Sequence, residues 1–444
     1  MSESFHTPPR TNRRKFLGLA AGGAATVGGA VALRMPTGAT PDNAAASADP
    51  SAEPSPITPP RPLAASADVA GRTLVVIELQ GGNDGLATLV PRNAGTLYDR
   101  REAVHVADEE LLDFTDEFGW HPNLAPLLAH NVAALTGVGV TGRPDGSHFE
   151  MERRWWAGKS TGSDLPGTGF LGRLCDQLVT DQPVTGLSMG NGPSPALRSD
   201  KAITVAMNDP SASWFLRSEE PWFQNLRNAM LDMSGDRVSG ASPHQSAMAS
   251  LSDTVDFAES LSEIDRDRID DRYPNTQLGE SLGVAAELIE IDAGIRVIHV
   301  THGGFDTHSN QVGAHANLLD QLGQATGAFL DDIADRGLGE STLVCTTSEF
   351  GRRVRANGSG TDHGAAGMAI LAGPVVSGVH GEAPSLSRLD DDNLIATADL
   401  EEYYATLAEQ WFGVASSEVL DSGAAPIDGS VSYTHLTLPT IYSV

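Results

Sequence analysis

Short apolar runs bounded by glycine or polar turns recur along the chain and predict buried strands. The clearest are TLVVIEL at 73–79, GIRVIHV at 294–300 and STLVCTT at 341–347, with weaker candidates at 131–140 and 367–376. Each run is short and lacks a regular polar position. This pattern is typical of strands that are covered on both faces.

Helical patterns lie between these runs, most clearly at 147–158, 281–292, 312–337 and 398–413. Strands that alternate with helices of this length favour βαβ crossovers. We therefore predict an α/β fold in which a mostly parallel sheet carries helices on both faces. The stretch 196–280 has few strand signals and many polar residues, so we interpret it as a cap or insertion.

Both ends of the chain differ from this pattern. Residues 1–46 place Arg13 and Arg14 before an uncharged, weakly apolar run, which indicates a twin-arginine signal peptide and export out of the cytoplasm. An uncleaved membrane anchor is the alternative.

Residues 47–71 are rich in Pro, Ser and Ala and predict a disordered linker. Residues 431–444 change abruptly to Thr, Tyr and β-branched residues, and we interpret them as a non-native tail.

The composition narrows the class of protein. The 444 residues are 40% hydrophobic, which is enough for a large core, and the formal net charge is −29. Such an acidic chain lacks the basic surface that binding to a phosphate backbone requires, so we expect no nucleic acid partner.

The two cysteines, Cys175 and Cys345, lie in apolar segments. We interpret them as core residues, with a disulfide in an exported protein as the alternative.

Polar side chains follow each strong strand at its carboxyl end, where the loops of a parallel sheet converge. QGGNDGL follows the first strand, THGGFDTHSNQ overlaps and follows the second, and SEFGRR with GTDHG follows the third. Imidazole and carboxylate groups suit divalent metals such as Zn²⁺ or Mn²⁺, and oxygen-rich sets suit Mg²⁺ or Ca²⁺. We therefore predict a divalent metal site, although the same residue types are common in exposed loops. The candidate ligands are Asp84, Asp306, His308, Glu349 and His363.

Two further residues are candidates for catalysis. Ser147 precedes a predicted helix, where free amides and the helix dipole could stabilise an attacking hydroxyl or a bound anion. Ser147 and Glu150 also have capping-box spacing, which predicts a purely structural role. The neighbouring His148 is a rival ligand or base. Arg352 could stabilise negative charge that develops on a substrate.

Several motifs in their order along the chain resemble one family. LVVIELQGGNDGLATLVP, SHFEMERRWWAG, THGGFDTHSNQ, TTSEFGRRVRANGSGTDHGAAGMAILAGP and YYATLAEQWFG are similar to exported bacterial proteins of the family of unknown function 1501 (DUF1501). The resemblance covers residues 72–425 and implies the α/β/α sandwich of the alkaline phosphatase-like superfamily. That superfamily includes phosphatases, sulfatases and phosphomutases, and its members bind two metals at the strand ends.

The resemblance also implies roles for individual residues. Asp84 resembles the first-strand metal carboxylate, Asp306 and His308 resemble the Asp and His of one metal site, and His363 resembles the late histidine ligand. Glu349 stands where the superfamily commonly has an Asp-His pair, but Phe350 replaces the histidine. No cysteine or serine has the Pro- and Arg-containing setting of a sulfatase nucleophile, and Ser147 is assigned by position only.

Together these features predict an exported, metal-dependent hydrolase of phosphate or sulfate esters, acting on a small molecule or a polymer. The alternative is a catalytically silent binding or partner protein on the same scaffold, acting with another exported protein. A polysaccharide binder is a third interpretation. The absence of an imidazole beside Glu349 favours the second interpretation more than the fold alone does, since a fold can persist without its chemistry.

Overall fold

The computed structural model describes residues 30–32, 71–142, 146–178, 184–190, 192–207, 221–234 and 264–431. The predicted leader lies outside these residues except for β1 (Ala30–Ala32), and the predicted linker lies outside them except for its last residue. Of the predicted tail, only Val431 is described, and it forms a bridge with Val375. The leader, linker and tail remain predictions.

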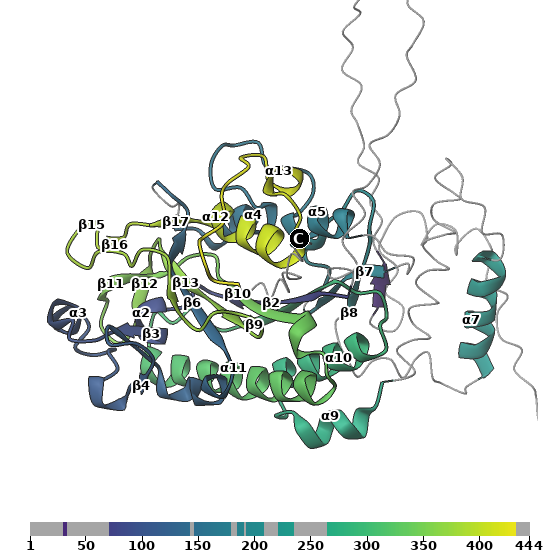
Figure 1. Cartoon of the computed structure of the whole chain (residues 1–444), viewed down its shortest axis with the longest axis horizontal. Helices are drawn as coiled ribbons and strands as arrows, with labels where there is room; N and C mark the ends of the chain where they lie inside the picture. Colours follow the sequence, from purple (N-terminus) through teal and green to yellow (C-terminus); the bar gives the residue numbers. More distant parts are fainter. Residues whose placement is uncertain are drawn as a thin grey trace, which may run out of the picture.

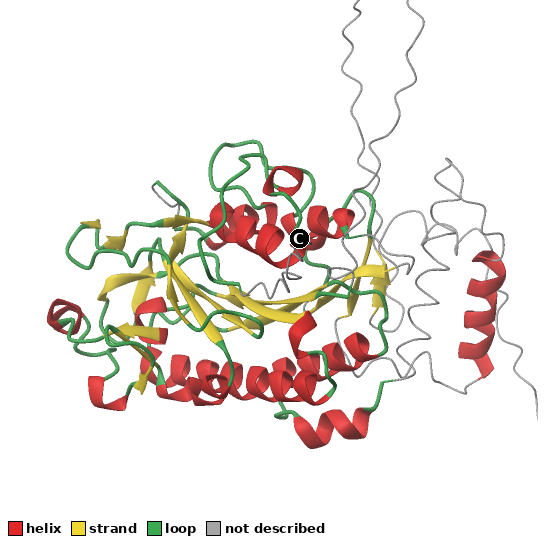
Figure 2. Ribbon diagram, viewed as in Figure 1, coloured by secondary structure: helices red, strands yellow, loops and turns green. Residues whose placement is uncertain are grey.

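A mixed sheet of ten strands forms the centre of the fold (Figures 1 and 2). Five neighbouring strands run parallel, in the order β8 (Ile203–Met207), β7 (Val184–Met189), β9 (Val297–Gly303), β2 (Thr73–Gln80) and β10 (Thr342–Thr347). Beyond β10, β13 (Gly367–Ala372) is antiparallel to both β10 and β6 (Val132–Gly139). The remaining strands lie at the two edges: β1 pairs with β8, while β14 (Gly378–His380) and β17 (Ala398–Asp399) pair with β6.

Helices cover both faces of this sheet (Figure 1). On one face lie α10 (Gln277–Glu290) and α11 (Gln311–Asp335), with α9 (Arg266–Arg272) packed against α10. The other face carries α4 (His148–Ala157), α5 (Phe170–Gln177), α12 (Leu400–Ala405) and α13 (Ser416–Val419).

Strand β2 shows why both faces are covered. Val75, Ile77 and Leu79 belong to the core on the α10 and α11 side, whereas Leu74 and Val76 belong to the core on the opposite side. Successive side chains of a strand point to opposite faces, so a continuous apolar run needs two cores. The predicted α/β fold, an α/β/α sandwich with a mostly parallel central sheet, is confirmed.

Smaller elements surround the sheet. Three small sheets are formed by β3 (Leu89–Pro91), β4 (Leu112–Asp113) and β5 (Phe118–Trp120), by β11 (Arg352–Ala356) and β12 (Thr361–His363), and by β15 (Leu389–Asp390) and β16 (Asn393–Leu394). The other helices and turns are α2 (Gly85–Thr88), α3 (Gly95–Arg100), α7 (Pro221–Ser234), the 3-10 turns η1 (Asp108–Glu110), η2 (Pro122–Ala129), η3 (Pro195–Leu197) and η6 (Gly339–Ser341), and the π-helix η7 (Thr406–Trp411).

The predicted strands and helices are all present, with shifted ends, but five strands of the sheet had no prediction. Three are the short edge strands β1, β14 and β17, and the others are β7 and β8, whose short runs contain Thr, Gly and Ser among the apolar residues. Strand β8 falls within the stretch 196–280, so that part of the predicted cap belongs to the sheet. Residues 208–220 and 235–263 lie outside the described residues, and the boundaries of the insertion remain a prediction.

Cys175 and Cys345 are both buried and free, on α5 and β10 respectively. Their interpretation as small core residues is confirmed, and the alternative of a disulfide is wrong.

Within the part of the chain that the structure describes, no helix combines the length and the apolar content needed to cross a bilayer.

Candidate metal centre

The candidate site is built where the loops after β2, β9 and β10 meet. The two glycines after β2 allow this close approach, because a Cβ atom on Gly81 would lie 2.3 Å from the backbone nitrogen of Asp306. Gly81 also has a φ of +115°, which a residue with a side chain rarely adopts. The loop that carries Asp306 is further held by a hydrogen bond of 3.0 Å from the Phe305 amide to the Gln80 carbonyl.

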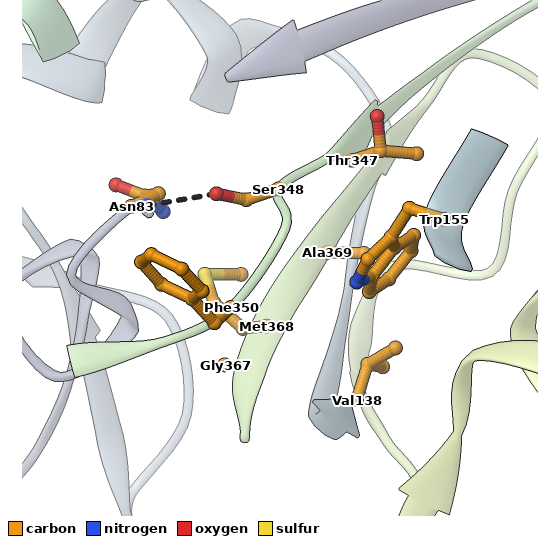
Figure 3. A pocket seen from close by; sticks show the side chains of 9 residues that line it. All are labelled: Asn83, Val138, Trp155, Thr347, Ser348, Phe350, Gly367, Met368 and Ala369. Atoms are coloured by element: carbon orange, nitrogen blue, oxygen red, sulfur yellow. Dashed lines mark hydrogen bonds between the residues drawn. The ribbon is translucent and has the colours of Figure 1, made fainter. Parts of the chain in front are cut away.

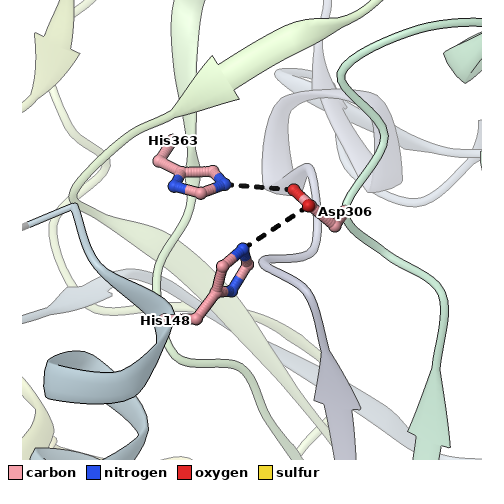
Figure 4. Close-up of side chains that lie close together, drawn as sticks. All are labelled: His148, Asp306 and His363. Carbon is pink, nitrogen blue, oxygen red and sulfur yellow. Dashed lines mark hydrogen bonds and ion pairs between the residues drawn. The ribbon is translucent and has the colours of Figure 1, made fainter.

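Three side chains from distant parts of the chain converge at this point (Figure 4). His148 is the first residue of α4, Asp306 follows β9, and His363 ends β12. The carboxylate of Asp306 lies 3.0 Å from His363 Nε2 and 3.5 Å from His148 Nε2. One potential ligand atom from each residue lies within 4.8 Å of the other two, a spacing that could hold a metal ion.

A third histidine extends the group. His308 Nε2 lies 3.0 Å from Asp306 Oδ1 and 2.9 Å from His363 Nε2. Asp306 therefore has the Nε2 atoms of three imidazoles around its carboxylate. We call His148, Asp306, His308 and His363 the four-residue cluster.

The opposite ring nitrogen of each histidine has an acceptor of its own. His148 Nδ1 lies 2.8 Å from Glu349, His308 Nδ1 lies 3.2 Å from Asp362, and His363 Nδ1 lies 2.8 Å from the Gly146 carbonyl. A carbonyl or carboxylate oxygen can only accept, so each Nδ1 carries the hydrogen. In the neutral ring Nε2 is then a bare lone pair, which is the form that binds a metal.

The electrostatics of the cluster favour a cation. Burial alone would raise the pKa of Asp306, but its neighbours Arg352 and His363 lower it to about 2, so the group is ionised. The hydrogen bond to Glu349 is the main cause that raises the pKa of His148. Burial, followed by the charges of Glu349 and Glu78, raises the pKa of Glu152 to about 7. The surroundings of the cluster are thus rich in negative charge.

The side chain of Arg352 is buried and donates to the carbonyls of Gly82, Thr361, Gly81 and Phe305, and at 2.8 Å to Asp306. Its predicted role toward charge on a substrate stays a prediction, and most donors of the guanidinium are bound to the protein. Arg352 joins the loops and orients Asp306.

Glu349 lies behind the cluster rather than in it. Its carboxylate accepts from the Gly81 amide at 2.8 Å and from His148. The predicted role as a direct ligand is therefore corrected to one that orients a ligand. Its neighbour Phe350 fills the space beside the cluster, with its ring centroid 5.0 Å from that of His148 and 4.4 Å from that of His363.

Behind Phe350 the structure leaves room for about one water molecule (Figure 3). The Ser348 hydroxyl closes this space by accepting from the Asn83 amide at 2.8 Å and donating to the Leu79 carbonyl at 2.9 Å. These bonds tie the end of β10 to the loop after β2. The cluster therefore has a packed floor, and its exposed side is formed by Asp306 and His308.

Asp84 is the predicted ligand that the structure places elsewhere. It is fully buried, caps α2, and pairs with Arg101 at 2.6 Å and Gln311 at 2.5 Å. Asp84 is not among the residues that converge with Asp306, and its two side-chain donors already neutralise the buried carboxylate. His302 is likewise apart from the cluster, buried and close to the Leu318 carbonyl at 3.1 Å.

The buried surroundings of Asp84 give a pH-dependent prediction. His315 Nε2 lies 2.9 Å from the Asn83 side-chain oxygen, and burial lowers the pKa of His315 to about 4. An unfolded histidine titrates near 6.5, so the unfolded chain binds a proton that the folded chain does not between about pH 6.5 and pH 4. This histidine should therefore cost roughly 3 kcal/mol of stability as the pH falls through that window.

The measurement is urea unfolding of the wild type and of His315→Gln across the same pH range. The variant should be less stable at pH 7.5, and the difference should shrink towards pH 4. A difference between the two proteins that does not change with pH would contradict the assignment of His315 as a buried neutral histidine.

Ser147 occupies the N-cap position of α4, yet its side chain makes no cap hydrogen bond. Glu150 instead pairs with Arg154 at 2.8 Å and with Arg153 at 3.4 Å. The capping-box interpretation is therefore wrong for this helix. Ser147 stands between Gly146 and His148, both of which take part in the bonds of the cluster, so its hydroxyl remains a candidate at the edge of the site.

Sequence reasoning left the role of His148 open and assigned no role to Asp362. His148 lies in a helix start far from the strand ends along the chain, so only its neighbour Ser147 pointed to it. Asp362 directly precedes His363 in GTDHG, and it orients His308 across the β11–β12 pair. An acidic residue beside a predicted histidine ligand was the available signal for it.

The family described as protein of unknown function (DUF1501) matches residues 145–409, which is more than half of the chain. Among curated proteins, none matches the sequence.

Several solved structures are similar at low identity. A sulfatase from Pseudoalteromonas sp. has 13% identity and a TM-score of 0.38, and the match covers 80% of this chain and 70% of that one. A lipoteichoic acid synthase from Listeria monocytogenes has 9% identity and a TM-score of 0.34, covering 82% and 77%. A protein of the alkaline phosphatase superfamily from Vibrio parahaemolyticus has 11% identity and a TM-score of 0.34, covering 77% and 66%.

The matched range 145–409 contains all four residues of the cluster, together with Glu349 and Asp362, which orient two of its histidines. It leaves out β2 and the loop with Asp84. The extent of this match establishes that the chain belongs to the DUF1501 family.

Proposed function

We propose that this protein is an exported, metal-dependent hydrolase of phosphate or sulfate esters. The observation that carries the proposal is the convergence of three imidazole Nε2 atoms on the carboxylate of Asp306. In the tautomer with hydrogen on each Nδ1, these Nε2 atoms face the carboxylate with lone pairs, which repel unless a cation lies between them. A bound divalent metal would satisfy this arrangement.

The residues that would hold the metal are those of the four-residue cluster. Imidazole and carboxylate ligands suit Zn²⁺, Mn²⁺ or Fe²⁺. When bound, such a metal supplies Lewis acidity that polarises an ester oxygen and lowers the pKa of a coordinated water. The exposure of Asp306 and His308 leaves one side of the cluster open to a substrate.

The chain supplies two further features to the proposed reaction. Helix α4 begins at the cluster, and the amides of its first turn carry the partial positive charge of a helix N-terminus, which favours an anionic ester group. The Ser147 hydroxyl precedes this turn and is our candidate nucleophile. Arg352 contributes by holding Asp306 in position.

The test is turnover of a panel of aryl phosphate and aryl sulfate esters by metal-loaded protein. Metal-stripped protein is the control. We expect hydrolysis of at least one class that is lost on stripping and restored by metal. Ser147→Ala should then lower kcat by at least about 100-fold if the hydroxyl attacks. Unchanged turnover in this variant would assign the attack to water. Metal binding without any turnover would favour the alternative of a binding or partner protein.

Export is proposed from the N-terminal sequence. The adjacent Arg13 and Arg14 would direct the folded chain to the twin-arginine machinery, and a co-exported protein is a proposed partner. Replacing both arginines by lysine should retain the protein in the cytoplasm of an expressing cell. Export at the wild-type level by this double variant would refute the proposed route.

A further inference from the structure

The four-residue cluster differs from the two-metal arrangement that the sequence resemblance implies. We infer that this centre binds a single metal ion through His148, Asp306, His308 and His363, with Glu349 and Asp362 as positioning residues. This inference deepens the proposed function, since it concerns the same site. It makes no assumption about which ester is cleaved.

The separations between ligand atoms fit one coordination sphere. Two ligands about 2.1 Å from a tetrahedral metal lie about 3.4 Å apart. The separations are 2.9 Å between His308 Nε2 and His363 Nε2, 3.0 Å from each of these atoms to Asp306, and 3.5 Å from His148 Nε2 to Asp306. His148, Asp306 and His363 already offer atoms within 4.8 Å of one another, and His308, which contacts both Asp306 and His363, would be the fourth ligand.

The hydrogen positions on the imidazole rings also favour a bound metal ion. His308 Nδ1 and His363 Nδ1 each face an oxygen that can only accept, so in the neutral rings neither Nε2 atom has a hydrogen to place between them. In this tautomer the two Nε2 lone pairs face each other at 2.9 Å, an arrangement that a cation between them would stabilise. A metal ion can accept the lone pairs of three imidazoles at once, whereas one proton bridges only a single pair.

Two strand-end carboxylates that the resemblance assigns to metal binding are already bound by protein donors. Asp84 is paired with Arg101 and Gln311, both by side-chain contacts. Glu349 accepts from His148 and from a backbone amide. Because these two carboxylates are already bound by protein donors, neither is available to complete another site.

Glu78 is the other buried carboxylate at the end of β2. It pairs with His299 at 3.1 Å and accepts from Trp156 Nε1 at 2.8 Å. Its side chain is 9% exposed, so a second ion would have to displace these partners within the core. Protein donors therefore already occupy the Glu78 carboxylate.

The ligand set also indicates the class of metal. Three imidazoles and one carboxylate favour borderline ions such as Zn²⁺ and Co²⁺, whereas Mg²⁺ and Ca²⁺ prefer oxygen ligands. The acceptors on the far side of His148 and His308 are carboxylates, which fix each ring and increase the basicity of its Nε2. This arrangement gives Glu349 and Asp362 their positioning role.

The experiment uses the full-length chain stripped of metal. Titration with Co²⁺, followed by visible absorption, reports the number and the geometry of bound ions, and elemental analysis after Zn²⁺ loading gives the stoichiometry. We expect one ion per chain and the intense absorption of four-coordinate Co²⁺. Mg²⁺ and Ca²⁺ should not compete at equal concentration.

Three variants sharpen the test. His308→Ala should lose most of the Co²⁺ absorption, because one of the four ligands is removed. Glu349→Gln should keep the absorption but weaken binding by about 10- to 100-fold. His380→Ala is the matched control, since His380 lies on β14 and contacts the Val376 carbonyl instead of the cluster, and it should bind like the wild type.

Two bound ions per chain, no bound ion, or a His308→Ala variant with an unchanged spectrum would each overturn the inference. Failure of the proposed function is a separate result. A protein that binds one ion with the expected spectrum but cleaves no ester supports the inference and refutes the hydrolase.

Discussion

Asp306→Asn is expected to weaken metal binding by more than about 100-fold, because it removes the only negative charge among the four ligands. Ester hydrolysis should fall by roughly 1,000-fold, since metal coordination contributes several kcal/mol to the transition state and each 1.36 kcal/mol is a factor of ten. The amide is nearly isosteric with the carboxylate, and Arg352 keeps its four backbone acceptors. The stripped variant should therefore fold.

Isothermal titration with Zn²⁺, circular dichroism and the ester assay together check this expectation. Asp391→Asn is the matched control, because Asp391 is an exposed residue that pairs with Arg353 at 3.5 Å and is not part of the cluster. A folded Asp306→Asn protein that binds Zn²⁺ as tightly as the wild type would show that the cluster is not the metal centre.

Arg101→Met should be the most destabilising of the substitutions considered. Asp84 is fully buried and Arg101 is 1% exposed, and their side chains lie 2.6 Å apart. Removing one partner of such a pair leaves a buried charge without compensation and costs about 3–5 kcal/mol. The guanidinium also donates to the carbonyls of Val354 and Arg353, so the variant loses contacts between α3 and β11 as well.

The pH dependence identifies the cause of this loss. Burial by itself would raise the pKa of Asp84, and the charge of Arg101 is the main cause that lowers it below its ordinary value. Without Arg101 the pKa of Asp84 should rise, so the carboxyl can take up a proton as the pH falls. Urea unfolding at pH 7.5 and pH 5 should therefore show a smaller deficit at pH 5.

Arg92→Met is the control for this stability experiment. Arg92 pairs with Asp113 at 2.7 Å, but Asp113 is fully exposed to solvent. An exposed ion pair contributes little to stability, so this variant should unfold at nearly the wild-type urea concentration. Equal losses in the two arginine variants would mean that burial of the Asp84 pair is not what stabilises the fold.

Much of the fold followed from the order of apolar and polar residues. The strong strands 73–79, 294–300 and 341–347 became β2, β9 and β10, because a continuous apolar run is stable only where both faces are covered. Strands β7 and β8 escaped prediction, since polar residues and glycine interrupt their short apolar runs.

Part of the site followed from the same logic. Asp306 and His308 come directly after a buried strand, and His363 follows another at a short distance, so their chemistry and their edge of the sheet could be predicted. Asp84 comes after a strand in the same way, yet it is paired with Arg101, which lies in a segment without any motif. Glu349 is separated from the centre by the ring of His148.

The sequence by itself determined the fold class, the family and the edge of the sheet at which imidazoles and carboxylates gather. It did so because periodicity and strand ends are local properties of the chain. The tertiary structure alone decided which of these groups form the four-residue cluster. It also decided which groups orient the ligands and which are neutralised in the core. That division depends on contacts between residues hundreds of positions apart, such as His148 with Glu349 and Asp84 with Gln311.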